Sequence, residues 1–151
     1  MLLSERRRTT DNRPPTSSRG QSSAVKKENV AIKRIDHIAI AVEDMDRSLG
    51  FWEKALGLHV HGIQNVPEQA VDIAFLPIGQ SEVELVKPVT ADSGIAKWLA
   101  KRGPGIHHIC FEVDDLRATL AELAAHGMEL IDQAPRERDG KLSMTASDIE
   151  D

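Results

Sequence analysis

The sequence is poor in three features, and each scarcity excludes a class of protein. One of the 151 residues, Cys110, is a cysteine, so no internal disulfide forms and a reducing compartment is favoured. No apolar run approaches the roughly 20 residues that span a bilayer, and the apolar start at residues 1–3 is too short for a secretory signal. The 24 acidic residues outnumber the 19 lysines and arginines, which argues against binding to duplex DNA. We therefore expect neither a membrane nor a nucleic acid as partner.

The charge is spread unevenly along the chain. Residues 1–29 carry seven basic and three acidic side chains, whereas the rest of the chain carries 12 basic and 21 acidic ones. The first segment is nearly empty of large apolar groups, so it buries too little surface to offset its ordering entropy. We predict a disordered basic tail over residues 1–31 and one domain over residues 32–151. The expected location is cytoplasmic, or the mitochondrial matrix if the Arg- and Ser-rich tail is a transit peptide.

From residue 32 onward, the hydrophobic pattern predicts a β-α-β-β-β unit. Residues 35–42 combine small and branched side chains, as in a strand covered on both faces. A helix follows, with Asp44 in the N-cap position, apolar residues at helical spacing, and Gly57 just past its end. Three short strands are then predicted over Leu58–Ile63, Val71–Leu76 and Glu82–Val86.

The same pattern begins again 71 residues further along the chain. Six of the fifteen residues over 35–49 are identical to their counterparts over 106–120. Because a whole supersecondary unit recurs, the repeat sets the architecture before any motif is considered. We predict an α+β fold in which two tandem β-α-β-β-β modules form a curved mixed sheet around a metal cleft. The predicted parts are module one over 32–88, a linker helix over 89–104 and module two over 105–151.

The repeat places a histidine at the same position on the first strand of each module. A lone strand histidine is usually a core residue, but a pseudo-twofold axis would bring His37 and His108 to one site. On the strand over residues 81–86, Glu82 and Glu84 either point together toward the cleft or form an ordinary solvated face. Imidazole ligands suit zinc, cobalt, nickel and iron, and a carboxylate extends the range to harder divalent ions. The pattern therefore indicates a divalent metal site.

Five stretches of the sequence point to one family: IDHIAIAV, FWEKALGL, VPEQAVDIAFLPIGQSEVELVKP, IAKWLAKRGPGIHHICFEVDDL and GMELIDQAPR. Over residues 32–138 the chain resembles the methylmalonyl-CoA epimerases of the vicinal oxygen chelate (glyoxalase and bleomycin-resistance) superfamily. The resemblance implies inversion of the carbon between a thioester and a carboxylate, through a metal-stabilised enolate. It also implies an acyl-CoA substrate, a homodimer and a divalent ion: cobalt first, with zinc, manganese, nickel or magnesium as alternatives.

The resemblance also assigns site residues. Matched position by position, it implies His37, Glu84 and His108 as metal ligands, with a fourth ligand, a glutamate, on the last strand of module two. Two bases on opposite faces of the substrate would exchange the proton, and Glu68 is a candidate for one of them. The nearest basic residues form either a binding site for the coenzyme A phosphates or an ordinary solvated helix face; they are Lys97, Lys101 and Arg102.

The end of module two departs from the family pattern. By the spacing in module one, the fourth ligand would fall beyond Asp151, and residues 136–151 resemble a polar acidic tail that lacks the closing strand pair. The stretch Ser147–Glu150 resembles Ser81–Glu84, which makes Glu150 a candidate for the missing acid. Module two is therefore predicted to be incomplete. Three hypotheses stay open: an active epimerase, an inactive or binding-only remnant, and a glyoxalase-like lyase.

Two neighbours of His108 are not predicted to be ligands. His107 is expected to point to the opposite face of the strand. Cys110 lies between two apolar residues and is expected to pack as a small apolar group.

Overall fold

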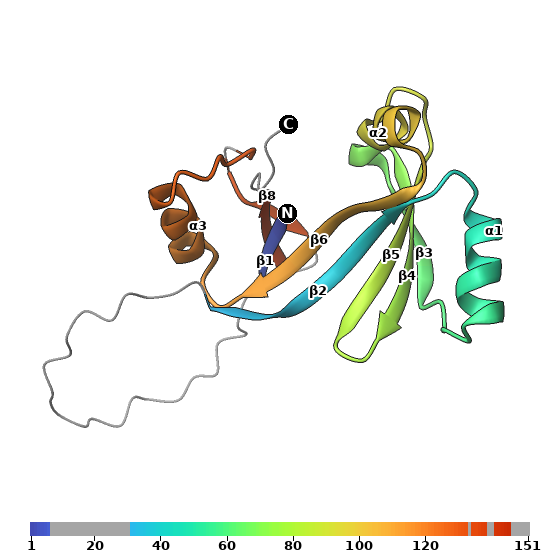
Figure 1. Cartoon of the computed structure of the whole chain (residues 1–151), viewed down its shortest axis with the longest axis horizontal. Helices are drawn as coiled ribbons and strands as arrows, with labels where there is room; N and C mark the ends of the chain where they lie inside the picture. The colour runs from blue at the N-terminus through green and yellow to red at the C-terminus, as the bar shows by residue number, and fades with distance from the viewer. Residues whose placement is uncertain (7–30, 133, 139–140, 146–151) are drawn as a thin grey trace, which may run out of the picture. The chain divides into compact units, whose positions relative to one another are not determined.

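The computed structural model describes residues 1–6, 31–132, 134–138 and 141–145 (Figure 1). The contacts divide the chain into two compact units, one of Met1–Leu2 and Arg34–Phe111 and the other of Leu3–Lys33 and Glu112–Asp151. The division crosses two long strands instead of falling between the predicted modules; these strands are β2 (Ile32–Ala41) and β6 (Gly105–Val113). Each of them therefore contributes residues to both units.

A mixed sheet forms the first unit. Its strands lie in the order β3 (Gly62–Val66), β4 (Val71–Ile78), β5 (Ser81–Pro88), β2 and β6. β3, β4 and β5 pair antiparallel, whereas β5 and β2 pair parallel. The parallel register sets His37 opposite Glu82 and Ala39 opposite Glu84. Since partners across a ladder share a face of the sheet, both glutamates lie on the face of His37.

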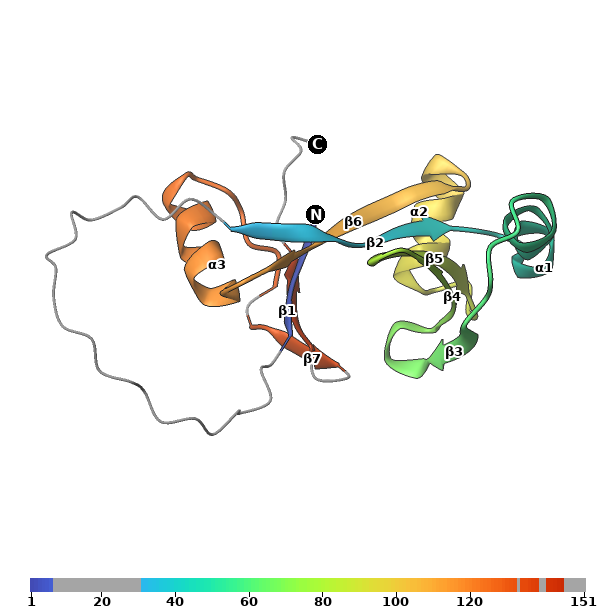
Figure 2. The same ribbon diagram turned by 90° about the horizontal axis from the view of Figure 1, so that it is seen from below.

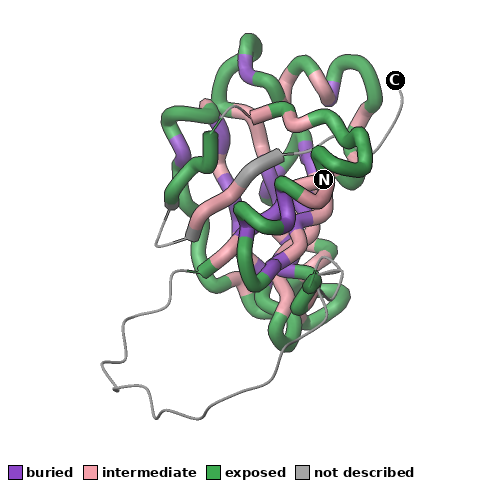
Figure 3. The backbone as a smooth tube through the Cα atoms, turned by 90° about the vertical axis from the view of Figure 1, so that its left-hand side faces the viewer, coloured by how far each residue is buried: buried purple, intermediate pink, exposed green. Residues whose placement is uncertain are grey.

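Alternation along β5 divides its side chains between two hydrophobic clusters. Val83 and Leu85 pack in one cluster with Met45 of the helical segment that follows β2. Val86 belongs to the other cluster. Ile95 of helix α2 (Gly94–Arg102) packs against that cluster. The two helical segments are seen beside the strands of this unit in Figure 2. The expectation that Val83 and Leu85 point away from the face of the two glutamates is confirmed. Figure 3 shows buried stretches of the backbone between intermediate and exposed ones.

The predicted first helix is present but changes its geometry halfway. Helix α1 (Met45–Leu49) begins after Asp44, whose side chain accepts a hydrogen bond from the Arg47 backbone N at 3.0 Å. It continues as a π-helix over Gly50–Ala55. The backbone N of Leu58 donates a hydrogen bond to the Trp52 carbonyl at 3.0 Å. Leu58 is therefore part of the end of the helix. For this reason the strand predicted from residue 58 begins only at residue 62.

The second unit contains the end of β6, helix α3 (Leu116–Ala125) and three short strands. From β6 outward the strand order is β1 (Leu2–Arg6), β8 (Lys141–Thr145) and β7 (Arg136–Arg138). β7 and β8 pair antiparallel, so the prediction of a strandless tail is wrong for residues 136–138 and 141–145. Residues 146–151, Glu150 among them, lie outside the described residues.

Strand β1 corrects the predicted disorder of the N-terminal segment over residues 2–6. The first unit orders its strands β3-β4-β5-β2, and the second unit matches this with β7-β8-β1-β6, so that β1 takes the place of β5. Leu3 is 1% exposed, and Glu5 Oε2 accepts a hydrogen bond from the Leu116 backbone N at 2.9 Å. The prediction of disorder rested on the composition of the whole segment, which is mostly polar. It therefore overlooked the two leucines of β1, Leu2 and Leu3. Residues 7–30 of the predicted tail lie outside the described residues.

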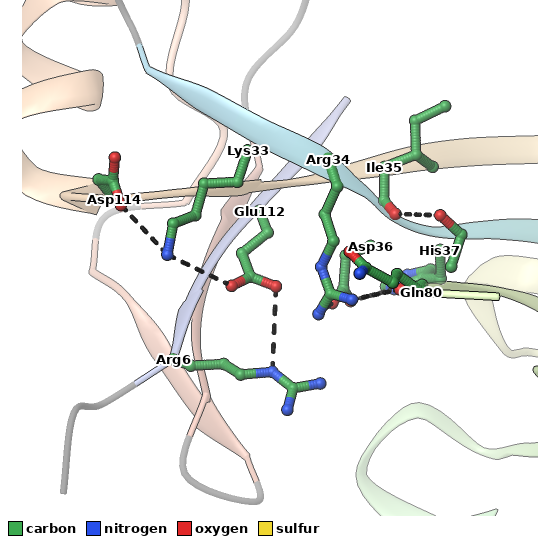
Figure 4. A network of polar contacts seen from close by, with 10 residues as sticks. Arg6, Lys33, Arg34, Ile35, Asp36, His37, Gln80, Glu112 and Asp114 are labelled. Carbon is green, nitrogen blue, oxygen red and sulfur yellow. Dashed lines mark hydrogen bonds and ion pairs between the residues drawn. The ribbon is translucent and has the colours of Figure 1, made fainter.

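A buried carboxylate on β6 is surrounded by cations in the second unit. The side chain of Glu112 is 10% exposed and lies 3.9 Å from Arg6 Nε and 3.9 Å from Lys33 Nζ. Lys33 also lies 3.1 Å from Asp114, and Figure 4 shows both of its contacts as dashed lines. A carboxylate buried without a cation is strongly destabilising, and both Arg6 and Lys33 lie within ion-pair distance of Glu112.

Helix α3 begins with a side-chain cap that offers a stability test. Asp115 accepts a hydrogen bond from the Ala118 backbone N at 2.9 Å. We expect Asp115→Ala to lower the free energy of unfolding by about 1 kcal/mol, because it leaves a helix N–H without its partner, whereas Asp115→Asn retains most of the cap. Denaturant unfolding of the full chain measures both variants, and equal stability of the two would contradict the assignment.

Candidate metal centre

Two of the predicted ligands meet in the first unit. His37 on β2 and His108 on the neighbouring strand β6 place their Nε2 atoms 3.2 Å apart. Their rings lie edge to face, with centroids 5.3 Å apart. Two imidazole nitrogens that each bind one ion at about 2.0–2.1 Å are separated by about 2.8–3.4 Å in octahedral or tetrahedral geometry. The spacing of the two nitrogens therefore fits a shared divalent ion.

A buried carboxylate orients His37. Asp36 is 6% exposed, and its Oδ2 accepts a hydrogen bond from His37 Nδ1 at 3.0 Å. Because a carboxylate only accepts, Nδ1 carries the proton and Nε2 is left to face His108. Asp36 Oδ1 lies 3.8 Å from Arg34, which also donates to the Gln80 carbonyl (Figure 4). Sequence reasoning missed Asp36 because strict alternation assigns adjacent strand residues to opposite faces.

The surroundings shift the pKa values of the two histidines in opposite directions. Burial, the largest single effect, lowers the pKa of His37. The hydrogen bond with Asp36, the Cys110 side chain and the charge of Glu84 together outweigh burial and raise the pKa of His37 to about 10. Burial first, and then the charges of His37, His107 and the N-terminal amine, lower the pKa of His108 to about 3.

Glu84 approaches the same group from β5. Its side chain is 15% exposed, and its Oε1 lies 3.6 Å from His37 Nδ1. The structure thus brings all three predicted ligands into one cluster within the first unit. Because the carboxylate approaches Nδ1 and not Nε2, the role of Glu84 as a ligand stays a prediction.

Two residues that were not predicted as ligands adjoin the histidines. Cys110 is fully buried, as expected, but its possible ligand atom and those of Asp36 and His37 all lie within 4.8 Å of one another. His107 Nδ1 lies 2.8 Å from His108 Nδ1, so His107 is not confined to the opposite face of β6. The sequence signal for Cys110 is its spacing of two residues from His108, which puts both side chains on one face of a strand.

The other predicted site residues make no hydrogen bond or ion pair with the two histidines in the described part of the chain. Glu68 is exposed in a short 3-10 helix over Pro67–Gln69. The three basic candidates are exposed on α2, whose Trp98 packs edge-on against His107 with ring centroids 5.3 Å apart. Helix α2 therefore lies beside the start of β6. The roles of these residues stay predictions; they are Glu68, Lys97, Lys101, Arg102 and Glu150.

Comparison with known proteins identifies the family. A family model described as Glyoxalase/Bleomycin resistance protein/Dioxygenase superfamily matches residues 36–145. The chain belongs to this superfamily. It is 40% identical over 106 residues to an uncharacterized protein of Bacillus subtilis, which covers 70% of this chain and 76% of the relative. It is 32% identical over 143 residues to the mitochondrial methylmalonyl-CoA epimerase of Mus musculus, covering 85% of this chain and 78% of that protein.

A solved structure shows the same superfamily fold. A variant of Streptomyces coelicolor methylmalonyl-CoA epimerase, in complex with 2-nitronate-propionyl-CoA, matches with a TM-score of 0.66 and 36% identity over 72% of this chain and 82% of that one. The predicted α+β class and the resemblance to the epimerases are thereby confirmed. Among the described residues, no helix is long and apolar enough to cross a membrane.

Proposed function

We propose that this superfamily member epimerises methylmalonyl-CoA at C2 by removing and returning the proton through a metal-stabilised enolate. The observation that carries the proposal is the 3.2 Å separation of the Nε2 atoms of His37 and His108. The epimerases from mouse and Streptomyces coelicolor support it, at 32% and 36% identity.

The chemistry assigns separate tasks to the residues of the cluster. The proton between a thioester and a carboxylate is too weakly acidic for an unaided side chain at neutral pH. A divalent ion held by His37, His108 and Glu84 would stabilise the negative charge that develops on the enolate oxygens. Asp36 holds the proton of His37 at Nδ1 and so keeps Nε2 aimed into the site. Cobalt is the first ion to test, ahead of zinc, manganese, nickel and magnesium.

Proton exchange on the two faces of the substrate needs two bases. Glu68 is proposed for one of them, since its exposed carboxylate is open to a bound substrate. Glu150 is retained for the other. The exposed cations of α2, at Lys97, Lys101 and Arg102, are proposed to bind the coenzyme A phosphates. Assembly as a homodimer and a cytoplasmic or mitochondrial location stay predictions.

Deuterium exchange tests the proposed function. The full chain is incubated with methylmalonyl-CoA in D₂O, with added cobalt or with a chelator, and the thioester is analysed by mass spectrometry. We expect deuterium at C2 with cobalt and none with the chelator, because the enolate loses its stabilisation. Equal exchange in both samples would contradict the metal-dependent mechanism. No exchange by a folded, cobalt-loaded chain would contradict the epimerase function.

A second candidate function is binding of the metal and the thioester without turnover. One observation favours it: β1 takes the place of β5 in the second unit, and its carboxylate, Glu5, is engaged by the backbone N of Leu116. Titration calorimetry with methylmalonyl-CoA would then show saturable binding in the samples that give no deuterium exchange. Deuterium exchange by the cobalt-loaded chain, or no saturable binding, would exclude this candidate.

A further inference from the structure

The second unit completes its sheet with β1, a strand that has no sequence counterpart in the first module. In the first unit, β5 places Glu84 opposite Ala39 of β2. In the second, β1 stands where β5 stands in the first. The carboxylate of β1, Glu5, accepts a hydrogen bond from the Leu116 backbone N at 2.9 Å. That position, at the N-terminus of α3, suits a carboxylate because of the helix dipole. The carboxylate of Glu5 therefore caps the start of α3.

The internal repeat identifies the residue of β6 that corresponds to Ala39 of β2. A shift of 71 residues relates His37 to His108, and the same shift relates Ala39 to Cys110. The first module therefore has a methyl group where the second has a thiol. Cys110 follows His108 by two residues on β6, so the sulfur and the imidazole lie on one face of the strand.

The thiol lies among other possible ligand atoms. Cys110 is fully buried, and its possible ligand atom lies in a group with those of Asp36 and His37, all within 4.8 Å of one another. His37 in turn lies 3.2 Å from His108 between their Nε2 atoms. Two imidazoles and a thiolate make a set of donors that zinc and cobalt favour and that magnesium and manganese do not.

We propose that Cys110 Sγ is a ligand of the divalent ion held by His37 and His108, an inference that rests on the proposed metal-dependent function. On binding, the thiol proton and the second proton of His37 are released to solvent, and the sulfur and the two Nε2 atoms donate electron pairs to the ion. The sulfur also makes the site selective for zinc and cobalt over the harder divalent ions.

Cobalt spectroscopy of the full chain tests this assignment. Cobalt(II) is added to the wild-type protein, to Cys110→Ser and to His108→Ala, and absorption is recorded from the near ultraviolet to the visible. Visible ligand-field bands report a bound ion, and a near-ultraviolet sulfur-to-cobalt charge-transfer band reports a thiolate ligand. We expect both features in the wild type. In Cys110→Ser we expect loss of the charge-transfer band and one fewer proton released per ion. Cobalt affinity should fall by more than about 100-fold, because loss of a residue that only hydrogen-bonds a ligand already lowers metal affinity by about 10–100-fold.

The possible outcomes separate the two proposals. Visible bands without a charge-transfer band in the wild type would overturn the role of Cys110 and leave the metal site standing. Absence of all bands from the folded wild type would overturn the metal site itself. Thermal unfolding of metal-free Cys110→Ser verifies its fold. Should serine at this buried position prevent folding, Cys110→Ala is compared instead, and a charge-transfer band that persists in that variant would overturn the assignment.

Discussion

Deuterium exchange at C2 of methylmalonyl-CoA is expected to fall by at least about 10²–10³-fold when either His37 or His108 is replaced by alanine, because the group that stabilises the developing charge is lost. The two Nε2 atoms lie 3.2 Å apart, so removal of either ring leaves a single imidazole at the site. Exchange is followed by mass spectrometry in the presence of cobalt, and cobalt content is measured in the same samples.

A histidine of the same unit serves as the control. His59 is exposed, and its ring lies beside that of His61 with centroids 6.5 Å apart. His59→Ala should exchange deuterium at the wild-type rate and retain the same cobalt content. If the His37 and His108 variants also kept both properties while folded, the metal assignment would be wrong.

The second large effect is expected at the N-terminal strand. Leu3 is 1% exposed within the second unit, and replacing a buried leucine by alanine typically destabilises a protein by about 2–5 kcal/mol. Leu3→Asp also buries a charge, so the loss should lie at or above the upper end of this range. We expect amide hydrogens of α3 and β8 to exchange with solvent at least about 100-fold faster in this variant, whereas those of β4 and β5 change less.

Arg6→Gln is the matched control on the same strand. The Arg6 side chain is 60% exposed and lies 3.9 Å from Glu112, a spacing and an exposure at which an ion pair contributes about 0–1 kcal/mol. Its amide exchange should stay close to that of the wild type. Normal protection of α3 in Leu3→Asp would show that β1 does not stabilise the second unit.

The internal repeat allowed much of the fold to be predicted. Local periodicity located the strand over residues 35–42, the helix after Asp44 and the counterparts of both in the second copy, because each depends on neighbours in sequence. The pairing of His37 with His108 followed from the same repeat. The structure places their rings in contact.

The features that could not be predicted depend on partners distant in sequence. Nothing local in the stretch over residues 2–6 indicates that a sheet far along the chain lacks a strand. Likewise, the contact of Asp36 with His37 departs from simple strand alternation and requires a particular side-chain geometry. The role of Cys110 depends on β6 lying next to β2; in sequence alone, it reads as one more small residue in an apolar run.

The position of β1 constrains how the chain is made. Glu5 is synthesised 111 residues ahead of Leu116, from whose backbone N it accepts a hydrogen bond. At about 5–20 residues per second, the ribosome needs about 6–22 s to cover that distance. During this interval the apolar side chains of Leu2 and Leu3 have no sheet to enter, while β2 to β5 can already assemble. The second unit therefore closes only after translation of β8, and a nascent-chain chaperone that covers the first residues would raise the yield of folded protein.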